Sequence, residues 1–443
     1  MRNSLSQIYN MKVLYDTSLF GASTSTYGFK SGLFRLAETL AFELVNHSEC
    51  EITFGAGVSL EIWSNSQKYL ESHPIFQEVP FISNSLGRTT RRKLYHLTEK
   101  YINISHKLGW RRTKKIREGI LSLLEYNLQS FSLEDLKQQD IYHSPYNALP
   151  SQVKKVKNLT RFLTVNDIIP VLYPHFFGLD KNLTKANKTY NLKESLDSLD
   201  SNDWILCISH STKKDLCNYL GNKIDEQKVF VTHLAASDLF YPCTNEREIT
   251  AVKKKYAIPN APYILSLSTL EPRKNIEQTI RCFARLVEQE KIADLHLVLA
   301  GSKGWIYDSI FQEISSNPKI KERVICTNYV ADEDLAALYS SALVFVYPSF
   351  YEGFGLPPLE AMQCGTPVIT SNTSSLPEVV GEAGIMIDPK DEDELCQQIL
   401  NVYNDSSLRD SLAVKARERA RKFSWQKCAQ ETIAAYQYAL DNS

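Results

Sequence analysis

The 443-residue sequence lacks the features of several large protein classes. Its 50 basic and 51 acidic residues leave a net charge of only −1, which by itself argues against a protein held on nucleic acid or anionic lipid. No apolar run reaches the roughly 20 residues that a membrane-spanning helix needs, and the first ten residues are polar. We find no internal repeat, which excludes a solenoid.

Cysteine pairs and dinucleotide-binding glycine motifs are also missing. The nine cysteines are scattered singly, without Cys-x-x-Cys or zinc-ligand spacing, which favours free thiols in a reducing compartment. No Gly-x-Gly-x-x-Gly follows a first strand, so a nicotinamide dehydrogenase is poorly supported. We therefore expect a cytoplasmic protein that carries no cofactor. Its composition, 43% hydrophobic and 23% charged, is that of a globular protein, and its length favours two domains.

The charge is distributed unevenly. Residues 88–117 contain eleven Lys or Arg and one Glu, a net charge of +10, so the rest of the chain carries −11. Apolar residues at steps of three and four give this segment the pattern of a basic amphipathic helix. One interpretation is a peripheral contact with an anionic membrane, on its inner face, and the other is a core-facing helix with a solvated basic side. Nucleic-acid binding is less favoured, because no known reader motif accompanies the charge.

Short β-rich runs alternate with longer helical patterns along the whole chain, which is typical of parallel α/β layers. In the first half the predicted strands are 11–16, 52–55, 140–143, 161–166, 204–209 and 228–233. In the second half they are 263–268, 295–301, 324–328, 343–347, 367–370 and 384–387. A charged, turn-rich stretch at 241–262 separates the two series. We predict an α/β fold with two Rossmann-like, doubly wound domains that hold a ligand at the carboxyl ends of their strands.

The densest chemical signal is Glu352-Gly-Phe-Gly-Leu-Pro-Pro-Leu-Glu360, between a buried strand and a helix. The glycines permit close backbone approach, and the start of a helix favours an anion such as phosphate. Glu352 on the loop and Glu360 one turn into the helix can both point into one cleft. Two carboxylates at this spacing suit a ligand with hydroxyl groups on either side of a diphosphate. The alternative is a glycine turn with two solvated glutamates.

The second signal is the pair Arg273 and Lys274, which follows the first strand of the second half. Cations at the carboxyl end of a buried strand can neutralise phosphate oxygens, because Arg offers a planar fork and Lys a compact charge. The alternative is a pair that caps a surface turn.

These two motifs resemble those of family 4 of the retaining GT-B glycosyltransferases. The Glu352 to Glu360 run is similar to the family's two glutamates spaced eight apart, and Glu271-Pro-Arg-Lys-Asn275 to its phosphate-binding element. Supporting matches are Gly301-Ser-Lys-Gly-Trp305, Leu376-Pro-Glu-Val379, Ser209-His-Ser-Thr-Lys213 and Phe423-Ser-Trp425. The resemblance implies a GT-B fold. It comprises an acceptor-binding domain (1–250), a nucleotide-sugar domain (251–423) and a terminal helix (424–441) that packs back on the first domain.

The resemblance also implies roles for individual residues. Arg273 and Lys274 would hold the donor diphosphate, Glu352 the donor sugar and Glu360 the ribose, and the first three are the predicted catalytic residues. The other predicted donor-binding residues are Gly353, Phe354, Gly355, Leu356, Gly32, Thr269 and Asn166. Gly32 lies in Lys30-Ser-Gly32-Leu-Phe-Arg35, which resembles the family's glycine-containing segment beneath the donor phosphates but keeps a single glycine of its doublet.

Asn166 departs from the family pattern. It lies in Phe162-Leu-Thr-Val-Asn166-Asp167, where many members carry His. Asn keeps hydrogen-bonding capacity but cannot take up a proton near neutral pH. We favour an orienting role, because a diphosphate leaving group needs charge stabilisation more than protonation.

Two acidic motifs, Asp332-Glu-Asp334 and Asp391-Glu-Asp393, have the Asp-x-Asp form that another glycosyltransferase architecture uses to hold a divalent metal. Each precedes a helical pattern, so we assign both to helix capping and predict metal-independent catalysis. His143 and His175 flank the predicted cleft, but a lone His is more often structural, so neither is assigned a catalytic role.

The resemblance therefore implies a retaining hexosyltransferase that moves a sugar from a UDP- or GDP-linked donor to a hydroxyl of a saccharide or lipid-linked saccharide acceptor. Such a reaction belongs to the synthesis of cell-surface polysaccharide or glycoconjugate. The alternatives are a catalytically silent subunit that binds the sugar nucleotide, which Asn166 keeps open, and a phosphorylase, for which no pyridoxal-phosphate lysine signal is found.

Overall fold

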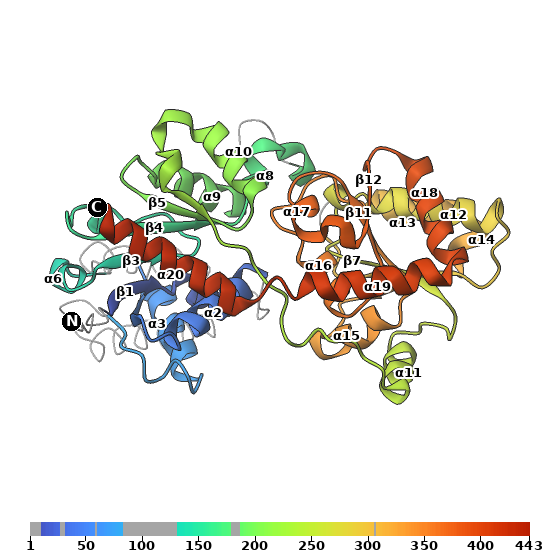
Figure 1. Ribbon diagram of the computed structural model, residues 1–443, viewed down its shortest axis with the longest axis horizontal. Helices are drawn as coiled ribbons and strands as arrows, with labels where there is room; N and C mark the ends of the chain where they lie inside the picture. Colours follow the sequence, from blue (N-terminus) through green and yellow to red (C-terminus); the bar gives the residue numbers. More distant parts are fainter. Residues whose placement is uncertain (1–9, 27–31, 58–59, 83–130, 179–186, 305–306) are drawn as a thin grey trace, which may run out of the picture.

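The computed structural model describes residues 10–26, 32–57, 60–82, 131–178, 187–304 and 307–443. These residues form two six-stranded parallel sheets, each covered by helices on both faces and each making one lobe of the molecule (Figure 1). No helix in the described part of the chain is long and apolar enough to cross a membrane. The basic segment 88–117 lies outside the described residues, so its predicted helix stays a prediction.

The first sheet has the strand order β2-β1-β3-β4-β5-β6. Its strands are β1 (Met11–Asp16), β2 (Cys50–Gly55), β3 (Ile141–Ser144), β4 (Thr160–Val165), β5 (Trp204–Cys207) and β6 (Val229–Val231). Its helices are α1 (Ser18–Thr26), α2 (Gly32–Val45), α3 (Leu60–Glu71), α6 (Leu133–Lys137), α7 (Ser151–Lys154), α8 (Ile169–Leu172), α9 (Asn187–Ser198) and α10 (His210–Leu220). Val13 and Tyr15 of β1 enter the core beneath α2, whereas Leu14 enters the core on the opposite face. This alternation makes β1 apolar almost throughout.

The second sheet has the order β12-β11-β10-β7-β8-β9, which is the Rossmann order in sequence terms. Its strands are β7 (Tyr263–Leu267), β8 (His296–Ala300), β9 (Val324–Asn328), β10 (Val344–Tyr347), β11 (Val368–Ser371) and β12 (Ile385–Ile387). Its helices are α12 (Ile276–Glu288), α13 (Asp308–Ser316), α14 (Pro318–Lys321), α15 (Asp332–Ser340), α16 (Leu356–Gln363), α17 (Leu376–Val380), α18 (Glu392–Asn404) and α19 (Ser406–Ala420).

All twelve predicted strands overlap an observed strand, and the predicted α/β fold class is confirmed. The prediction succeeds because most of the strands are buried on both faces and read as apolar runs, although the edge strand β9 is only partly buried. In β8, for example, Leu297 and Leu299 pack in one core of the second lobe while Val298 and Ala300 pack in the other.

The stretch between the two sheets contains a helix that the turn-rich sequence does not reveal. Helix α11 (Glu246–Lys255) begins at the N-cap Asn245, whose side chain accepts from the amides of Arg247 and Glu248. At its other end Lys255 contacts α15 through Asp334. The domain boundary near residue 250 stays a prediction.

The terminal helix α20 (Trp425–Asp441) leaves the second lobe and crosses the first sheet (Figure 1). Ser424 caps its start by accepting from the Lys427 amide. On its buried side, the Tyr436 hydroxyl lies 2.6 Å from His143 Nδ1, and His143 Nε2 lies 2.7 Å from Thr164 Oγ1. His143 is therefore fully buried beneath α20 and does not face the cleft, contrary to the sequence prediction, and burial lowers its pKa to about 3.

Candidate functional site

The loops that follow β7 and β10 lie side by side, because these two strands are neighbours at the centre of the second sheet. The Arg273 carbonyl accepts from the Phe350 amide at 2.9 Å and from Ser349 Oγ at 3.0 Å. Asn275 ends the first loop in the left-handed region, with φ of 54°. Segments about 75 residues apart in sequence are thus joined into one loop pair at the carboxyl edge of the sheet.

The three predicted catalytic residues meet in this loop pair. Lys274 Nζ lies 2.6 Å from Glu352 Oε1, and Arg273 Nη1 lies 2.7 Å from Glu352 Oε2. Ser349 Oγ also donates to Glu352 Oε1 at 2.6 Å, and Lys274 donates to the Tyr347 hydroxyl. One carboxylate therefore holds both cations in fixed positions.

The charged groups of this cluster shift one another's pKa values. Burial would raise the pKa of Glu352, but Arg273 and Lys274 lower it to about 2, so it stays ionised. Burial and the neighbouring Arg273 lower the pKa of Lys274. Burial opposes the charge of Arg273 too, but Glu352 and Glu271 raise its pKa. These four side chains are formally neutral together, and Arg273 Nε is buried without a hydrogen-bond partner among the described residues.

Glu360 occupies a different environment, in the first turns of α16. The Tyr339 hydroxyl donates to its Oε2 at 2.9 Å. Burial raises its pKa to about 7, although the bond from Tyr339 and the charge of Arg35 lower it. Arg35, on α2 of the first lobe, lies 2.8 Å from Asp332 of α15. The first turns of α2 and α16 therefore face the same junction between the lobes.

The first lobe closes directly on the glycine loop. Ser209, the N-cap of α10, donates to the Gly353 carbonyl at 2.7 Å. A side chain at Gly353 would place its Cβ 2.8 Å from the Asn166 carbonyl and 2.9 Å from Asp167 Cβ. Only glycine fits at this contact, because the backbones of the two lobes touch there.

A second contact between the lobes lies beside the loop. The Tyr351 hydroxyl donates to Asp215 of α10 at 2.6 Å. The rings of Phe176 and Phe350 are stacked, with centroids 5.8 Å apart. The hydrogen bond and the ring contact hold the loop after β10, which is predicted to bind the sugar, against the first lobe.

The remaining predicted residues lie around this junction. Phe354 is buried, and Gly355 has φ of 123° with Leu376 directly beneath it. Leu356 begins α16, and the two prolines that follow it have no amide hydrogen, so fewer helix N–H groups face a ligand than the sequence pattern suggests. Thr269 is exposed on the β7 loop, and Gly32 is exposed at the start of α2 with open space beside it.

The two acidic motifs differ in the structure. Asp391 caps α18, as predicted, by accepting from the Glu394 amide at 2.9 Å. Asp332 is not a cap: α15 has Ala331 at that position, and Asp332 instead binds Arg35 across the junction. The cap prediction is wrong here, because the cap depends on the exact residue at which the helix begins. Asp332 and Asp334 do lie in the first turn of α15, where a carboxylate complements the helix dipole.

Sequence reasoning did not single out Asp167, Glu271 and Tyr347. Burial raises the pKa of Asp167, while the nearby charge of Arg273 lowers it. Glu271 Oε1 accepts from Arg273 Nη2 at 2.6 Å. Glu271 lies in the predicted phosphate-binding element and Asp167 directly follows Asn166, so their neighbours in the sequence could have marked them as site residues. Nothing in the local sequence marks Tyr347.

Comparisons with known proteins agree with this architecture. Residues 248–420 match the family described as glycosyl transferases group 1. O-antigen chain mannosyltransferase B of Escherichia coli is 36% identical over 314 residues, which are 71% of this chain and 78% of that protein.

Solved structures with the same fold cover nearly the whole chain. Sucrose-phosphate synthase from Thermosynechococcus elongatus has a TM-score of 0.64 at 19% identity, over 98% of this chain and 100% of that one. Anabaena Alr3699/HepE in complex with UDP has a TM-score of 0.62 at 15% identity, over 97% of this chain and 100% of that one. The chain thus belongs to the group 1 glycosyltransferases and has the GT-B fold.

Proposed function

We propose that the protein is a retaining glycosyltransferase of family 4. It transfers a sugar from a nucleoside-diphosphate donor to a hydroxyl group of a saccharide or lipid-linked saccharide acceptor during polysaccharide synthesis. The observation that carries the proposal is the buried cluster of Arg273, Lys274 and Glu352 at the carboxyl edge of the second sheet, where the two lobes meet.

The cluster suits a leaving diphosphate. Arg273 Nε is a buried donor that a phosphate oxygen can satisfy, and Lys274 brings a compact charge beside it. Because Glu352 and Glu271 already pair with the two cations, a bound diphosphate must take over part of these contacts. Glu352 Oε2 is then released to accept from a hydroxyl of the donor sugar.

In the transfer step the bond between the anomeric carbon and the diphosphate oxygen breaks. A bond from that carbon to the acceptor oxygen forms on the same face of the sugar, and the hydroxyl proton passes to the departing diphosphate. Arg273 and Lys274 stabilise the developing negative charge, which a divalent metal would do in a metal-dependent enzyme. Asn166 orients a sugar hydroxyl, and Glu360 accepts from the ribose. The contact between Gly353 and the first lobe excludes water that would hydrolyse the donor.

The relatives favour particular substrates. The Escherichia coli relative is named for mannosyl transfer to an O-antigen chain, which favours a mannosyl donor and a growing saccharide as acceptor. The Anabaena structure is a complex with UDP, which supports a nucleoside-diphosphate donor for this protein. A lipid-linked acceptor would bring the enzyme to a membrane surface, for which residues 88–117 are the predicted contact.

The test is turnover of a panel of UDP- and GDP-linked sugars, including GDP-mannose and UDP-glucose, with released nucleoside diphosphate as the readout. We expect release that depends on a saccharide acceptor and persists in EDTA. Lys274→Ala and Glu352→Gln are expected to abolish it while remaining folded. Nucleotide binding without turnover of any donor would instead identify a silent binding subunit, and full activity of both variants would refute the site.

A further inference from the structure

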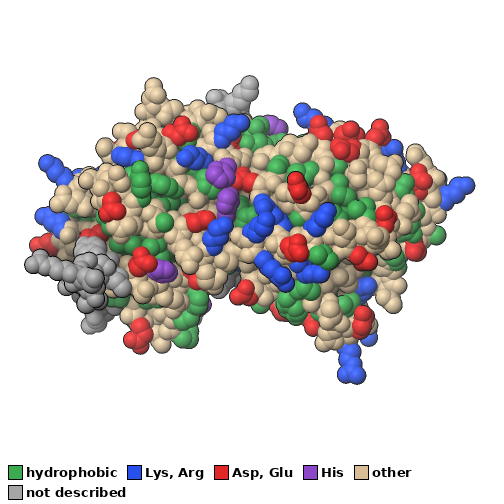
Figure 2. Space-filling view, in the orientation of Figure 1, with side chains coloured by type: hydrophobic (Ala, Val, Ile, Leu, Met, Phe, Trp, Pro, Cys, Tyr) green, Lys and Arg blue, Asp and Glu red, His purple; other side chains and the backbone are tan. Residues whose placement is uncertain are grey.

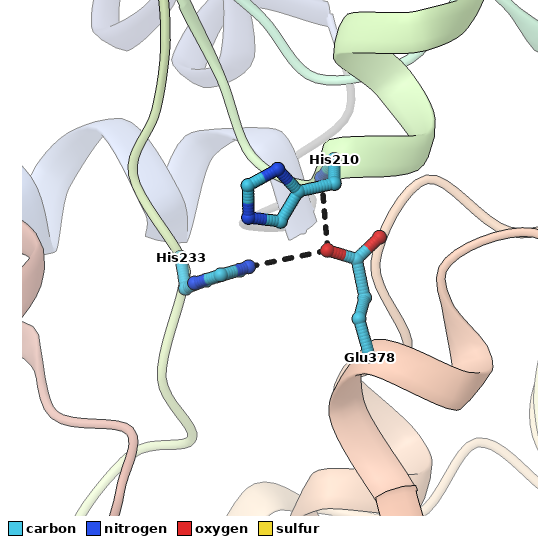
Figure 3. Close-up of side chains that lie close together, drawn as sticks. All are labelled: His210, His233 and Glu378. Carbon is cyan, nitrogen blue, oxygen red and sulfur yellow. Dashed lines mark hydrogen bonds and ion pairs between the residues drawn. The ribbon is translucent and has the colours of Figure 1, made fainter.

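Three side chains at the junction of the lobes form a cluster outside the proposed donor site. They are His210 at the start of α10, His233 after β6, and Glu378 on α17 (Figure 3). One ligand atom from each lies within 4.8 Å of the other two. Figure 2 shows histidine side chains at the surface where the lobes meet, so solvent reaches this region.

Glu378 is held in place by the other lobe. Its Oε2 accepts from the His210 amide at 2.8 Å, and its Oε1 accepts from the Ser211 amide at 3.0 Å. A carboxylate offers about four lone-pair positions, so these two bonds leave capacity on each oxygen. Burial would raise the pKa of Glu378, but its hydrogen bonds to His233 and to these amides lower it, so the carboxylate is ionised at neutral pH.

His233 is oriented before any ligand arrives. Its ring lies between Phe354 and Phe423, with centroids 6.0 Å and 5.9 Å away, and its amide donates to Glu431. Its Nε2 lies 3.2 Å from Glu378 Oε2. Two nitrogen or oxygen ligands on one tetrahedral zinc ion are about 3.3 Å apart, so this pair already has the required spacing.

We propose that His210, His233 and Glu378 form a site for a divalent transition ion of the Zn²⁺ class that joins the two lobes. Two imidazoles and a carboxylate are borderline ligands that suit this class, and water supplies the fourth position. His210 has to move closer to the other two; its side chain is exposed, and its ring already lies edge-on to the His233 ring with centroids 5.5 Å apart. The ion takes the place of the contact between His233 Nε2 and Glu378 Oε2, and the imidazole binds it through the lone pair of Nε2 with the ring proton on Nδ1.

The surrounding charges are balanced. Arg419 donates to the Glu378 carbonyl at 2.6 Å and opposes a cation, whereas the Glu431 carboxylate beside His233 favours one. The ion takes no part in the transfer step, because its ligands are none of the residues assigned to the donor. Its effect is mechanical: it bonds α10 and the β6 loop of the first lobe to α17 of the second.

The experiment measures Zn²⁺ binding to the full metal-free chain without a histidine tag, by titration calorimetry. We expect one ion per chain, and binding at least about tenfold weaker in His210→Ala and in His233→Ala. The matched control is His47→Ala, because His47 lies two residues beyond the end of α2, outside the cluster, and its ring accepts from the Glu49 amide. His210→Ala keeps the backbone contacts of Glu378 and is therefore expected to fold.

Co²⁺ substitution gives a second readout. A site of two imidazoles and a carboxylate shows visible ligand-field bands without thiolate-to-metal charge transfer. Equal Zn²⁺ affinity in wild type and both histidine variants, the absence of binding, or a thiolate band from the free cysteines would overturn the proposal. The cluster would then be a hydrogen-bonded contact between the lobes and nothing more.

Discussion

Replacing Glu352 by Gln tests the electrostatic account of the site, because the shape of the side chain is kept and its charge is removed. The folded protein lowers the pKa of Glu352 from 4.5 to about 2. At about 1.4 kcal/mol for each pH unit, this difference corresponds to about 3 kcal/mol of stability. That agrees with the roughly 3–5 kcal/mol that breaking a buried ion pair costs. Because the folded-state pKa is lowered, the stabilisation is present above pH 4.5 and is lost as the pH falls towards 2.

The assay is thermal or urea unfolding at pH 7 and again near pH 3. At pH 7 we expect Glu352→Gln to lower the melting temperature by roughly 6–12 °C, at 2–4 °C for each kcal/mol in a folding unit of 150–250 residues. Near pH 3 the difference shrinks, because Glu352 is protonated in the unfolded chain, where its pKa is 4.5, but is still largely ionised in the folded one, so folding must release its proton. A nucleoside diphosphate is expected to stabilise the variant more than the wild type, since its charge replaces the missing carboxylate beside Arg273 and Lys274.

Glu360→Gln is the matched control. It makes the same substitution eight residues away, but burial raises the pKa of Glu360 to about 7, so its ionised form is disfavoured in the folded protein. The variant is expected to be as stable as the wild type or more stable at pH 8. Equal melting temperatures for Glu352→Gln and the wild type at pH 7 would refute the reasoning.

Three further outcomes follow from particular contacts. Gly353→Ala forces its Cβ against the Asn166 carbonyl, so we expect at least about a tenfold loss of turnover. Normal turnover would contradict the closed contact between the lobes. Nucleotide affinity is expected to rise from about pH 6 to about pH 8 as Glu360 ionises, and this dependence should vanish in Glu360→Gln, as titration calorimetry can show. Asp391→Ala removes the cap bond to the Glu394 amide and should cost about 1 kcal/mol in urea unfolding without changing turnover. A loss of activity in that variant would point to a role beyond capping.

The fold could be predicted from the sequence because its signals are local. Each buried strand reads as an apolar run, and Leu297 to Ala300 in β8 need no partner to be recognised. The run from Gly353 to Glu360 and the pair Arg273 and Lys274 were recognisable for the same reason, because each motif is a short continuous stretch of sequence. The sequence predicted wrongly where the result depends on the exact residue at which an element begins. In α15, for example, the cap position is occupied by Ala331 and not by Asp332.

The sequence by itself determined the α/β layers, the two glutamates spaced eight apart and the cation pair, because periodicity and turn chemistry act over a few residues. Only the tertiary structure decided which of these groups meet. Lys274 and Glu352 are 78 residues apart, His210 and Glu378 are 168 apart, and His143 and Tyr436 are 293 apart. Such contacts depend on strand order and on how the lobes pack, and so do the opposite pKa shifts of Glu352 and Glu360, which burial and charged neighbours produce.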